Sequence, residues 1–222
     1  MSVDSLLSPA DREAIAAAVQ EAEQKTSGEI VVSVVAASDQ YTHAQWKGAA
    51  LGALLLVLTA AAVHDLGGYW GGPLPLWMTL PAAGGLAMGY VLASLPALRR
   101  LLASPEVVAR RVDARAAQAF LDAEVFRTRE RTGILLFVSL FEHRVVVLGD
   151  SGIKARVAQQ EWESIVAGVV RGMREGRPAA ALIEGIRLSG ELLERHGVRR
   201  GPDDVNELPD GPRAEKPLTH GR

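Results

Sequence analysis

The spacing of apolar residues changes along the first part of the chain and predicts two elements there. Apolar residues recur at helical spacing over residues 9–25, directly after Ser8 and Pro9, a favourable helix start. Residues 29–35 are β-branched and almost all apolar, which is typical of a strand buried on both faces. The chain therefore opens with a predicted helix followed by a predicted buried strand.

A second set of elements is predicted after residue 99. Ser104 and Pro105 begin an amphipathic segment, and the continuous apolar run 134–140 indicates another buried strand. A tight turn follows, so the next apolar run should form a third strand antiparallel to the second. The predicted elements are helix 104–125, strand 134–140, turn 141–144, strand 145–149, and helices 155–174 and 179–196.

Residues 48–98, between these two regions, carry a single charge, Asp65. A charge at the centre of a bilayer costs roughly 2.5–3.5 kcal/mol on insertion scales, so its absence over such a length favours membrane insertion. The block predicts two spans, about residues 48–64 and 74–98, with a connecting turn rich in glycine and interfacial aromatic residues. It begins too far from residue 1 for a secretory signal peptide.

Small residues and flanking bases refine this predicted transmembrane hairpin. Glycine recurs at four-residue spacing in both spans, at Gly48 and Gly52 and at Gly85 and Gly89, where it allows two helices to approach closely. Bases flank the outer ends of the hairpin and are absent from its loop; they are Lys47, Arg99, Arg100, Arg110, Arg111 and Arg115. The positive-inside rule then predicts a multi-pass protein of the inner (plasma) membrane with both termini in the cytoplasm.

Strands that are apolar on both faces require helices on both faces, so the predicted fold class is α/β. We expect a small αβα sandwich into which the transmembrane hairpin is inserted. In this prediction the sandwich is built from residues 1–46 and 99–196 and the hairpin from residues 47–98. Residues 197–222 are rich in proline, glycine and charge and are expected to form a disordered tail.

Composition excludes several classes of function. The chain has no cysteine, which excludes disulfides, thiol catalysis and cysteine-bound metals. A formal net charge of −2 does not fit a nucleic-acid-binding protein. There is no phosphate-binding glycine loop and no His-Glu-x-x-His pattern, so neither a nucleotide partner nor zinc-protease chemistry is expected.

The run Arg131-Thr132-Gly133 through Ser139, the following run Glu142 through Ile153, and Trp162 resemble the TPM-domain family. The inserted hairpin and the late stretch Asp203 through Asp210 are similar to the bacterial membrane-anchored branch of that family. The resemblance implies an αβα sandwich. It also implies functions that differ between relatives: photosystem II repair, acid phosphatase activity or receptor assistance, while most bacterial members have no assigned activity.

Asp150 is the first candidate for a binding residue, because it follows a predicted strand at the edge where α/β sheets place ligands. Glu29 and Glu142 are the other acidic residues next to predicted strands, and the three together would supply the oxygen ligands that a divalent cation requires. The alternative for Asp150 is a helix cap. The string Gly149-Asp150-Ser151-Gly152 also occurs in chymotrypsin-like proteases, but its setting between a strand and a helix argues for a simple turn.

Two functions remain open at this stage. The first is a membrane-anchored, non-enzymatic domain whose partners are the lipid bilayer and other membrane proteins that it binds or helps to maintain. The second is a metal-assisted, phosphatase-like hydrolase at the membrane surface, for which Asp150 and family analogy are the only support. The catalytic residues of such an enzyme are not identifiable in the sequence.

Overall fold

The computed structural model describes residues 3–68, 74–200 and 207–215. The chain divides into two compact units, which we call the α/β unit (residues 1–39 and 110–222) and the helical unit (residues 40–109). The centre of the predicted interhelical turn (residues 69–73), the Asp203-Asp204 stretch and the end of the predicted tail (residues 216–222) lie outside the described residues.

The described part of the α/β unit contains a four-stranded sheet and most of the helices. Its helices are α1 (Val3–Leu6), α2 (Pro9–Glu23), α6 (Pro105–Asp122, most of which lies in this unit), α7 (Ser151–Lys154), α8 (Gln159–Arg174) and α9 (Pro178–Arg195). Its strands are β1 (Ile30–Val35), β2 (Ile134–Ser139), β3 (Arg144–Gly149) and β4 (Arg213–Glu215). The fold is therefore a helix-rich α/β fold.

The sheet has the order β3-β2-β1-β4 and is mixed. β1 and β2 are parallel, with Ile30 opposite Ile134, and β2 and β3 are antiparallel, with Ile134 opposite Gly149. The antiparallel pair confirms the predicted turn between the second and third strands. β1 does not pair with β3, because β2 lies between them; its neighbours are β2 and β4.

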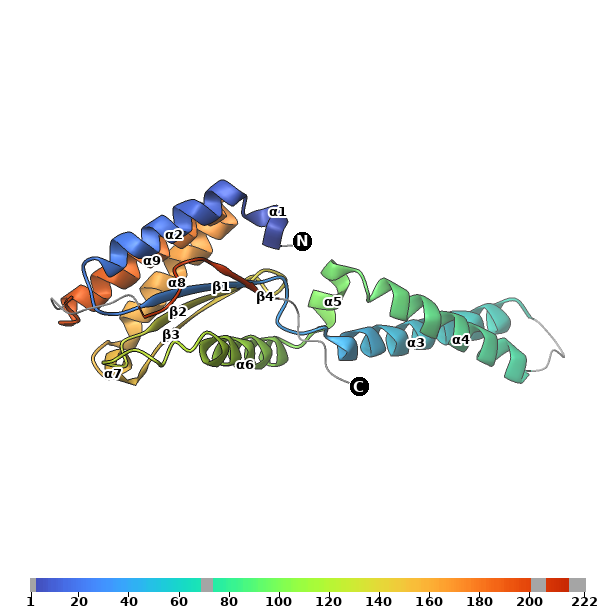
Figure 1. Cartoon of the computed structure of the whole chain (residues 1–222). Helices are drawn as coiled ribbons and strands as arrows, with labels where there is room; N and C mark the ends of the chain where they lie inside the picture. The colour runs from blue at the N-terminus through green and yellow to red at the C-terminus, as the bar shows by residue number, and fades with distance from the viewer. Residues whose placement is uncertain (1–2, 69–73, 201–206, 216–222) are drawn as a thin grey trace. The chain divides into compact units, whose positions relative to one another are not determined.

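Helices cover both faces of the sheet, with α2, α8 and α9 on one side and α6 on the other (Figure 1). Every residue of β1 and β2 is buried, as continuous apolar runs require. Alternate side chains of these strands, such as Val32 and Leu136, join the core formed with α2, α8 and α9. The buried face of α6 is formed by Val112, Arg115, Ala116 and Ala119.

The expectation of a disordered tail from residue 197 onward does not hold for residues 207–215. In this segment β4 extends the sheet, pairing in parallel with Ser33–Val35 of β1. A strand of three residues between prolines has almost no periodic pattern, which is why the tail composition did not reveal it.

The helical unit contains α3 (Thr42–Leu66), α4 (Leu74–Leu92) and α5 (Pro96–Leu102). α3 and α4 pack against each other. The second predicted span, about residues 74–98, is not one helix: α4 ends at Leu92 and α5 leaves at an angle of 105°. Pro96 favours this break, because it cannot donate a backbone hydrogen bond to the preceding turn.

Candidate functional site

Asp150 is buried and caps α7. Its Oδ1 accepts a hydrogen bond from the Ser151 backbone N–H at 2.6 Å, and its Oδ2 lies 2.7 Å from Nε of Arg131. Asp150 is therefore a helix cap, which was the alternative role predicted for it from the sequence. Because β3 is antiparallel to β1 and β2, the end of β3 lies beside the beginning of the parallel strands. Asp150 is consequently not at the edge where the parallel strands end, which was the reason for expecting a ligand there.

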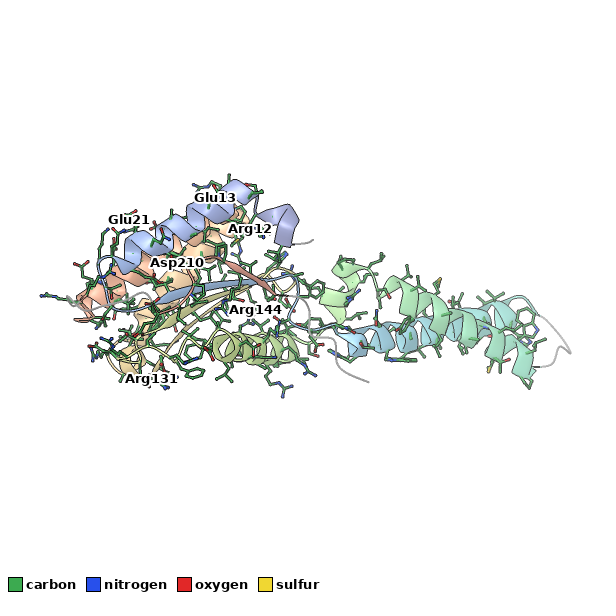
Figure 2. All side chains as sticks on the ribbon, viewed as in Figure 1. Arg12, Glu13, Glu21, Arg131, Arg144 and Asp210 are labelled. Atoms are coloured by element: carbon green, nitrogen blue, oxygen red, sulfur yellow. The ribbon has the colours of Figure 1, made fainter. Side chains whose placement is uncertain are left out.

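Glu142 lies at the opposite end of the sheet, in the turn between β2 and β3. Its Oε1 accepts a hydrogen bond from the Ser38 backbone N–H at 2.8 Å, and its Oε2 accepts one from the Ser139 hydroxyl. The Ser38 and Ser139 hydroxyls are also hydrogen-bonded to each other at 2.8 Å. This buried carboxylate fastens the loop after β1 to the end of β2. Arg144, at the start of β3, and Arg131, just before β2, are labelled in Figure 2 and lie at opposite ends of the sheet.

Glu29 is the predicted residue that lies in a cavity. It is 5% exposed and precedes β1, and its Oε1 accepts a hydrogen bond from the Glu207 backbone N–H at 3.0 Å. The adjacent cavity has a volume of about 190 Å³ and is lined by Gln20, Glu23, Gln24, Thr26, Glu29, Arg200 and Asp210. Gln20 donates to Oδ2 of Asp210 at 2.8 Å. The wall of the cavity thus comes from α2, from the residues just before β1 and from the C-terminal segment, whose Asp210 is labelled in Figure 2.

Glu23, at the last turn of α2, is the acidic partner of Glu29. Its Oε1 accepts a hydrogen bond from the Ile30 backbone N–H at 2.9 Å. Burial raises the pKa of Glu23 to about 8, and the nearby charges of Glu29 and Asp210 contribute. Burial also raises the pKa of Glu29, although the backbone N–H groups of Glu207 and Leu208 oppose that shift. The contact between the two carboxyls raises the pKa of Glu23 and lowers that of Glu29, so Glu23 is the proton donor of the pair.

The predicted cation ligands do not come together in the structure. Asp150 and Glu142 lie at opposite ends of β3, and Asp150 is occupied by a backbone N–H and an arginine. Among residues 3–68, 74–200 and 207–215, no three Asp, Glu or His side chains are placed to hold a metal ion. Glu23 lines the same cavity as Glu29 and has a raised pKa of about 8, so a cation bound there would have to displace a proton.

All but one of the exposed large apolar side chains among the described residues lie in the helical unit. α3 is long and apolar enough to cross a membrane: the mean hydropathy of its most apolar window is 1.9, and only 6% of that window is buried. α4 and α5 are long and apolar enough to cross a membrane only when they are taken together as a bent pair. The exposed large apolar side chains of this unit are Trp46, Leu51, Leu54, Leu55, Leu58, Val63, Leu66, Leu76, Met78, Leu80, Leu86, Met88, Val91, Leu92, Leu95, Leu98 and Leu101.

The four glycines predicted to allow close packing lie at the contact between α3 and α4. A Cβ added at Gly52 would lie 2.3 Å from the Gly85 carbonyl oxygen, and one added at Gly85 would lie 2.3 Å from that of Gly52. A Cβ at Gly89 would lie 2.2 Å from the carbonyl oxygen of Gly48. The two backbones therefore touch where any side chain would separate them, while Leu51, Leu54, Leu55 and Leu58 of α3 are exposed.

Aromatic pairs lie near both ends of the helical pair. Trp46 and Tyr90 meet edge to face at 5.5 Å between ring centroids, and His64 and Trp77 meet at 5.7 Å. Trp46 and His64 are separated by about 27 Å along α3 at 1.5 Å per residue, close to the roughly 30 Å thickness of a bilayer core. On α4 the partners are about 20 Å apart, and the whole helix is about 28 Å long.

Glu23, Glu207 and the α5 helix escaped the sequence analysis. Glu23 looks like an ordinary polar residue at the end of an amphipathic helix, and only the tertiary fold shows that it faces Glu29. Glu207 belongs to the acidic stretch that was noted for its resemblance but was assigned to the tail. The signal for α5 was available: Pro96 interrupts the second apolar segment, and prolines commonly start helices.

No protein-family model matches the sequence, and no curated protein matches it. A solved structure does resemble this chain: the NMR structure of the BA42 protein from the psychrophilic bacterium Bizionia argentinensis sp. nov. The two share 18% sequence identity with a TM-score of 0.58, over 96% of this chain and 99% of that one. At this identity the likeness supports the α/β fold and nothing about activity.

Proposed function

We propose that this protein is a membrane-anchored member of the TPM-domain family whose α3–α4 pair spans the bilayer and whose α/β unit binds or helps to maintain other membrane proteins. The observation that carries the proposal is the helical unit: two apolar helices joined through glycine backbones, with their leucines directed outward. A helix pair in water would place its leucines at the contact, as an apolar stripe requires. The reverse arrangement fits a lipid environment.

The hydrogen bonding of the pair supports the same conclusion. The polar hydroxyl of Thr59, exposed on α3, donates to the Leu55 carbonyl oxygen at 2.8 Å, and Ser94 donates to the Tyr90 carbonyl oxygen at 3.0 Å. Such back-bonding gives the hydroxyl hydrogen an acceptor without water, which suits a helix surrounded by hydrocarbon. The carboxyl of Asp65 lies in the last turn of α3, at an aromatic end of the pair and not at its centre.

The proposed orientation places both termini in the cytoplasm at the inner membrane. Lys47 begins the apolar part of α3, and Arg99 and Arg100 follow α4, so the bases lie at one end of the helical pair. The positive-inside rule assigns that end to the cytoplasm. A reporter that is active only in the cytoplasm, fused after His196, should give signal. Silence there together with signal from a periplasmic reporter would overturn the orientation.

Membrane insertion is tested by fractionation of the full-length protein. We expect it to sediment with membranes, to resist extraction by alkaline carbonate and to dissolve in mild detergent. A variant with Leu54, Leu55 and Leu58 changed to Ser should lose that resistance, whereas three matched serines on the α/β unit should not. Full-length protein that stays in the supernatant without detergent would refute the anchor.

The role of the α/β unit is tested by what binds to it and by what it can hydrolyse. Cross-linking in intact membranes followed by detergent purification of the full-length protein should recover other membrane proteins. The purified protein should not hydrolyse a generic phosphomonoester with Mg²⁺, Mn²⁺ or Ca²⁺. Robust metal-dependent turnover would instead establish the hydrolase, and turnover that survives the change Asp150→Ala would exclude Asp150 from its active site.

A further inference from the structure

α5 is a short helix whose position is defined by its contacts with the two longer helices. It leaves α4 at an angle of 105°, after a break at residues 93–95. The Nη2 of Arg99 folds back and donates to the Ser94 carbonyl oxygen at 2.6 Å, so it satisfies an acceptor at the end of α4. If α4 crosses the bilayer, a helix turned by 105° from it runs close to the membrane plane.

The exposed side chains of α5 are separated by type. Leu95, Leu98 and Leu101 are 52%, 37% and 78% exposed, and their three-residue spacing places them on one side of the helix. Arg100, two positions after Leu98, lies on the other side of the turn. α5 is therefore amphipathic: within the helical unit Leu95, Leu98 and Leu101 are exposed, while Leu102 on the same side packs near Gly48 of α3.

Contacts with α3 place α5 at the basic end of the helical pair. The Nζ of Lys47 donates to the Ser104 hydroxyl at 3.1 Å and to the Leu102 carbonyl oxygen at 3.4 Å. The exposed ring of Trp46, in the same turn of α3 as Lys47, pairs with Tyr90 of α4. α5 thus lies at the level of an aromatic pair and a lysine, the residues that collect where hydrocarbon meets headgroups.

We propose that α5 is an in-plane interfacial helix that inserts Leu95, Leu98 and Leu101 between acyl chains and places Arg99 and Arg100 against anionic phospholipid headgroups. This inference rests on the proposed membrane span. The charge of the segment argues for anionic lipid, because residues 74–104 contain two arginines and no acidic residue. Bases near an anionic surface each strengthen its attraction by about fivefold.

The test uses depth-dependent quenching in the full-length protein. The chain has no cysteine, so single changes to Cys at Leu58, Leu101 and Leu121 give three unique sites for an environment-sensitive fluorophore. All three leucines are exposed, at 59%, 78% and 60%, so labelling them does not disturb a core. Leu58 reports the middle of α3, Leu101 reports α5, and Leu121 on α6 is the matched control in the α/β unit.

The labelled proteins are reconstituted in phosphatidylcholine vesicles with and without phosphatidylglycerol. With the anionic lipid present, a spin label high on the acyl chain should quench the Leu101 site, a deep spin label the Leu58 site, and aqueous iodide the Leu121 site. The change Arg100→Gln should lower the ratio of inserted to water-exposed α5 about fivefold, and removal of phosphatidylglycerol, which removes the attraction of both arginines, should lower it about 25-fold. Neither change should move the Leu58 signal.

The outcomes separate the inference from the proposed function. A Leu58 site in hydrocarbon with a Leu101 site quenched by iodide would overturn the inference and leave the membrane span intact. A Leu58 site quenched by iodide would overturn both. A Leu101 site shielded from lipid and aqueous quenchers would show that protein covers α5, and insertion that ignores phosphatidylglycerol would overturn the assignment to anionic headgroups.

Discussion

Replacing Glu23 with Gln should stabilise the α/β unit, and the gain should depend on pH. Glutamine has the shape and hydrogen-bonding capacity of a protonated glutamate. Its amide oxygen can accept from the Ile30 N–H, which Oε1 of Glu23 accepts from at 2.9 Å, and its amide NH₂ can donate to Glu29. The variant therefore keeps both contacts and loses only the ability to ionise.

The sign follows from the raised pKa. Glu23 has a pKa of about 8 in the folded protein and an ordinary value of 4.5 when unfolded. Below pH 4.5 both states hold the proton and Glu23 contributes no pH dependence. As the pH rises from 4.5 to about 8, the unfolded state releases its proton first, so the free energy of unfolding falls by up to about 1.4 kcal/mol per pH unit. Above pH 8 both states are ionised and the loss is complete.

The magnitude is reduced because Glu23 is half-buried. Between pH 4.5 and 7 a fully buried group would cost about 3 kcal/mol by this linkage, and water at the cavity relaxes part of that cost. We expect Glu23→Gln to raise the free energy of unfolding by about 1–2 kcal/mol at pH 7 and to leave it unchanged at pH 4. Glu21→Gln, on the exposed side of the same helix, is the matched control and should change neither value.

The assay is urea unfolding of the full-length protein in mild detergent, followed by the fluorescence of Trp162. This side chain is 8% exposed and belongs to the core of the α/β unit. The other three tryptophans are replaced with Phe in every protein compared, so that the signal reports this unit alone. Equal stabilisation at pH 4 and pH 7, or none at either, would refute the raised pKa of Glu23 in the folded protein.

Four further changes test other parts of the structure. Gly85→Ala should separate α3 from α4 and lower cross-linking between cysteines placed on the two helices, whereas Gly84→Ala, whose added Cβ would meet its nearest neighbour at 4.0 Å, should not. Asp150→Ala should cost about 1 kcal/mol of unfolding free energy through the lost cap, measured by urea unfolding. Glu142→Ala should cost about 2–3 kcal/mol in the same measurement, because the buried Ser38 N–H loses its acceptor. Deleting residues 207–215 should expose the edge of β1 and increase aggregation, seen by light scattering.

The sequence predicted well those elements whose apolar pattern is long and regular. Burial of one or both faces selects apolar residues at regular spacing, and this spacing predicted strands β1, β2 and β3 and helices α2, α8 and α9. The glycine contact between α3 and α4 was also predictable, because small residues at four-residue spacing have a known geometric use.

The candidate site was predicted poorly, since it depends on which segments meet in space. Glu29 was chosen for its position before a strand, but its partner Glu23 and the backbone of Glu207 come from elements far apart in the chain. Asp150 follows an edge strand that is antiparallel to β2, so it lies at the end of the sheet where β1 and β2 begin and not where they end. Short segments such as α7 and β4 carry too few residues for any period to show.

The interruption of the α/β unit by the helical unit also affects how the protein can fold. Ser38 and Glu142 are hydrogen-bonded although they stand 104 positions apart, and closing so long a loop of flexible chain is entropically unfavourable. The Gln45 side chain and the Ser94 hydroxyl, 49 positions apart, are already joined at 3.1 Å at the base of the helical pair. Once α3 and α4 have docked, much of that loop entropy has been lost in advance, so the two halves of the sheet meet as near neighbours. If the helical pair inserts into a membrane as proposed, insertion would fix this contact early, and a chain that failed to insert would complete its sheet more slowly.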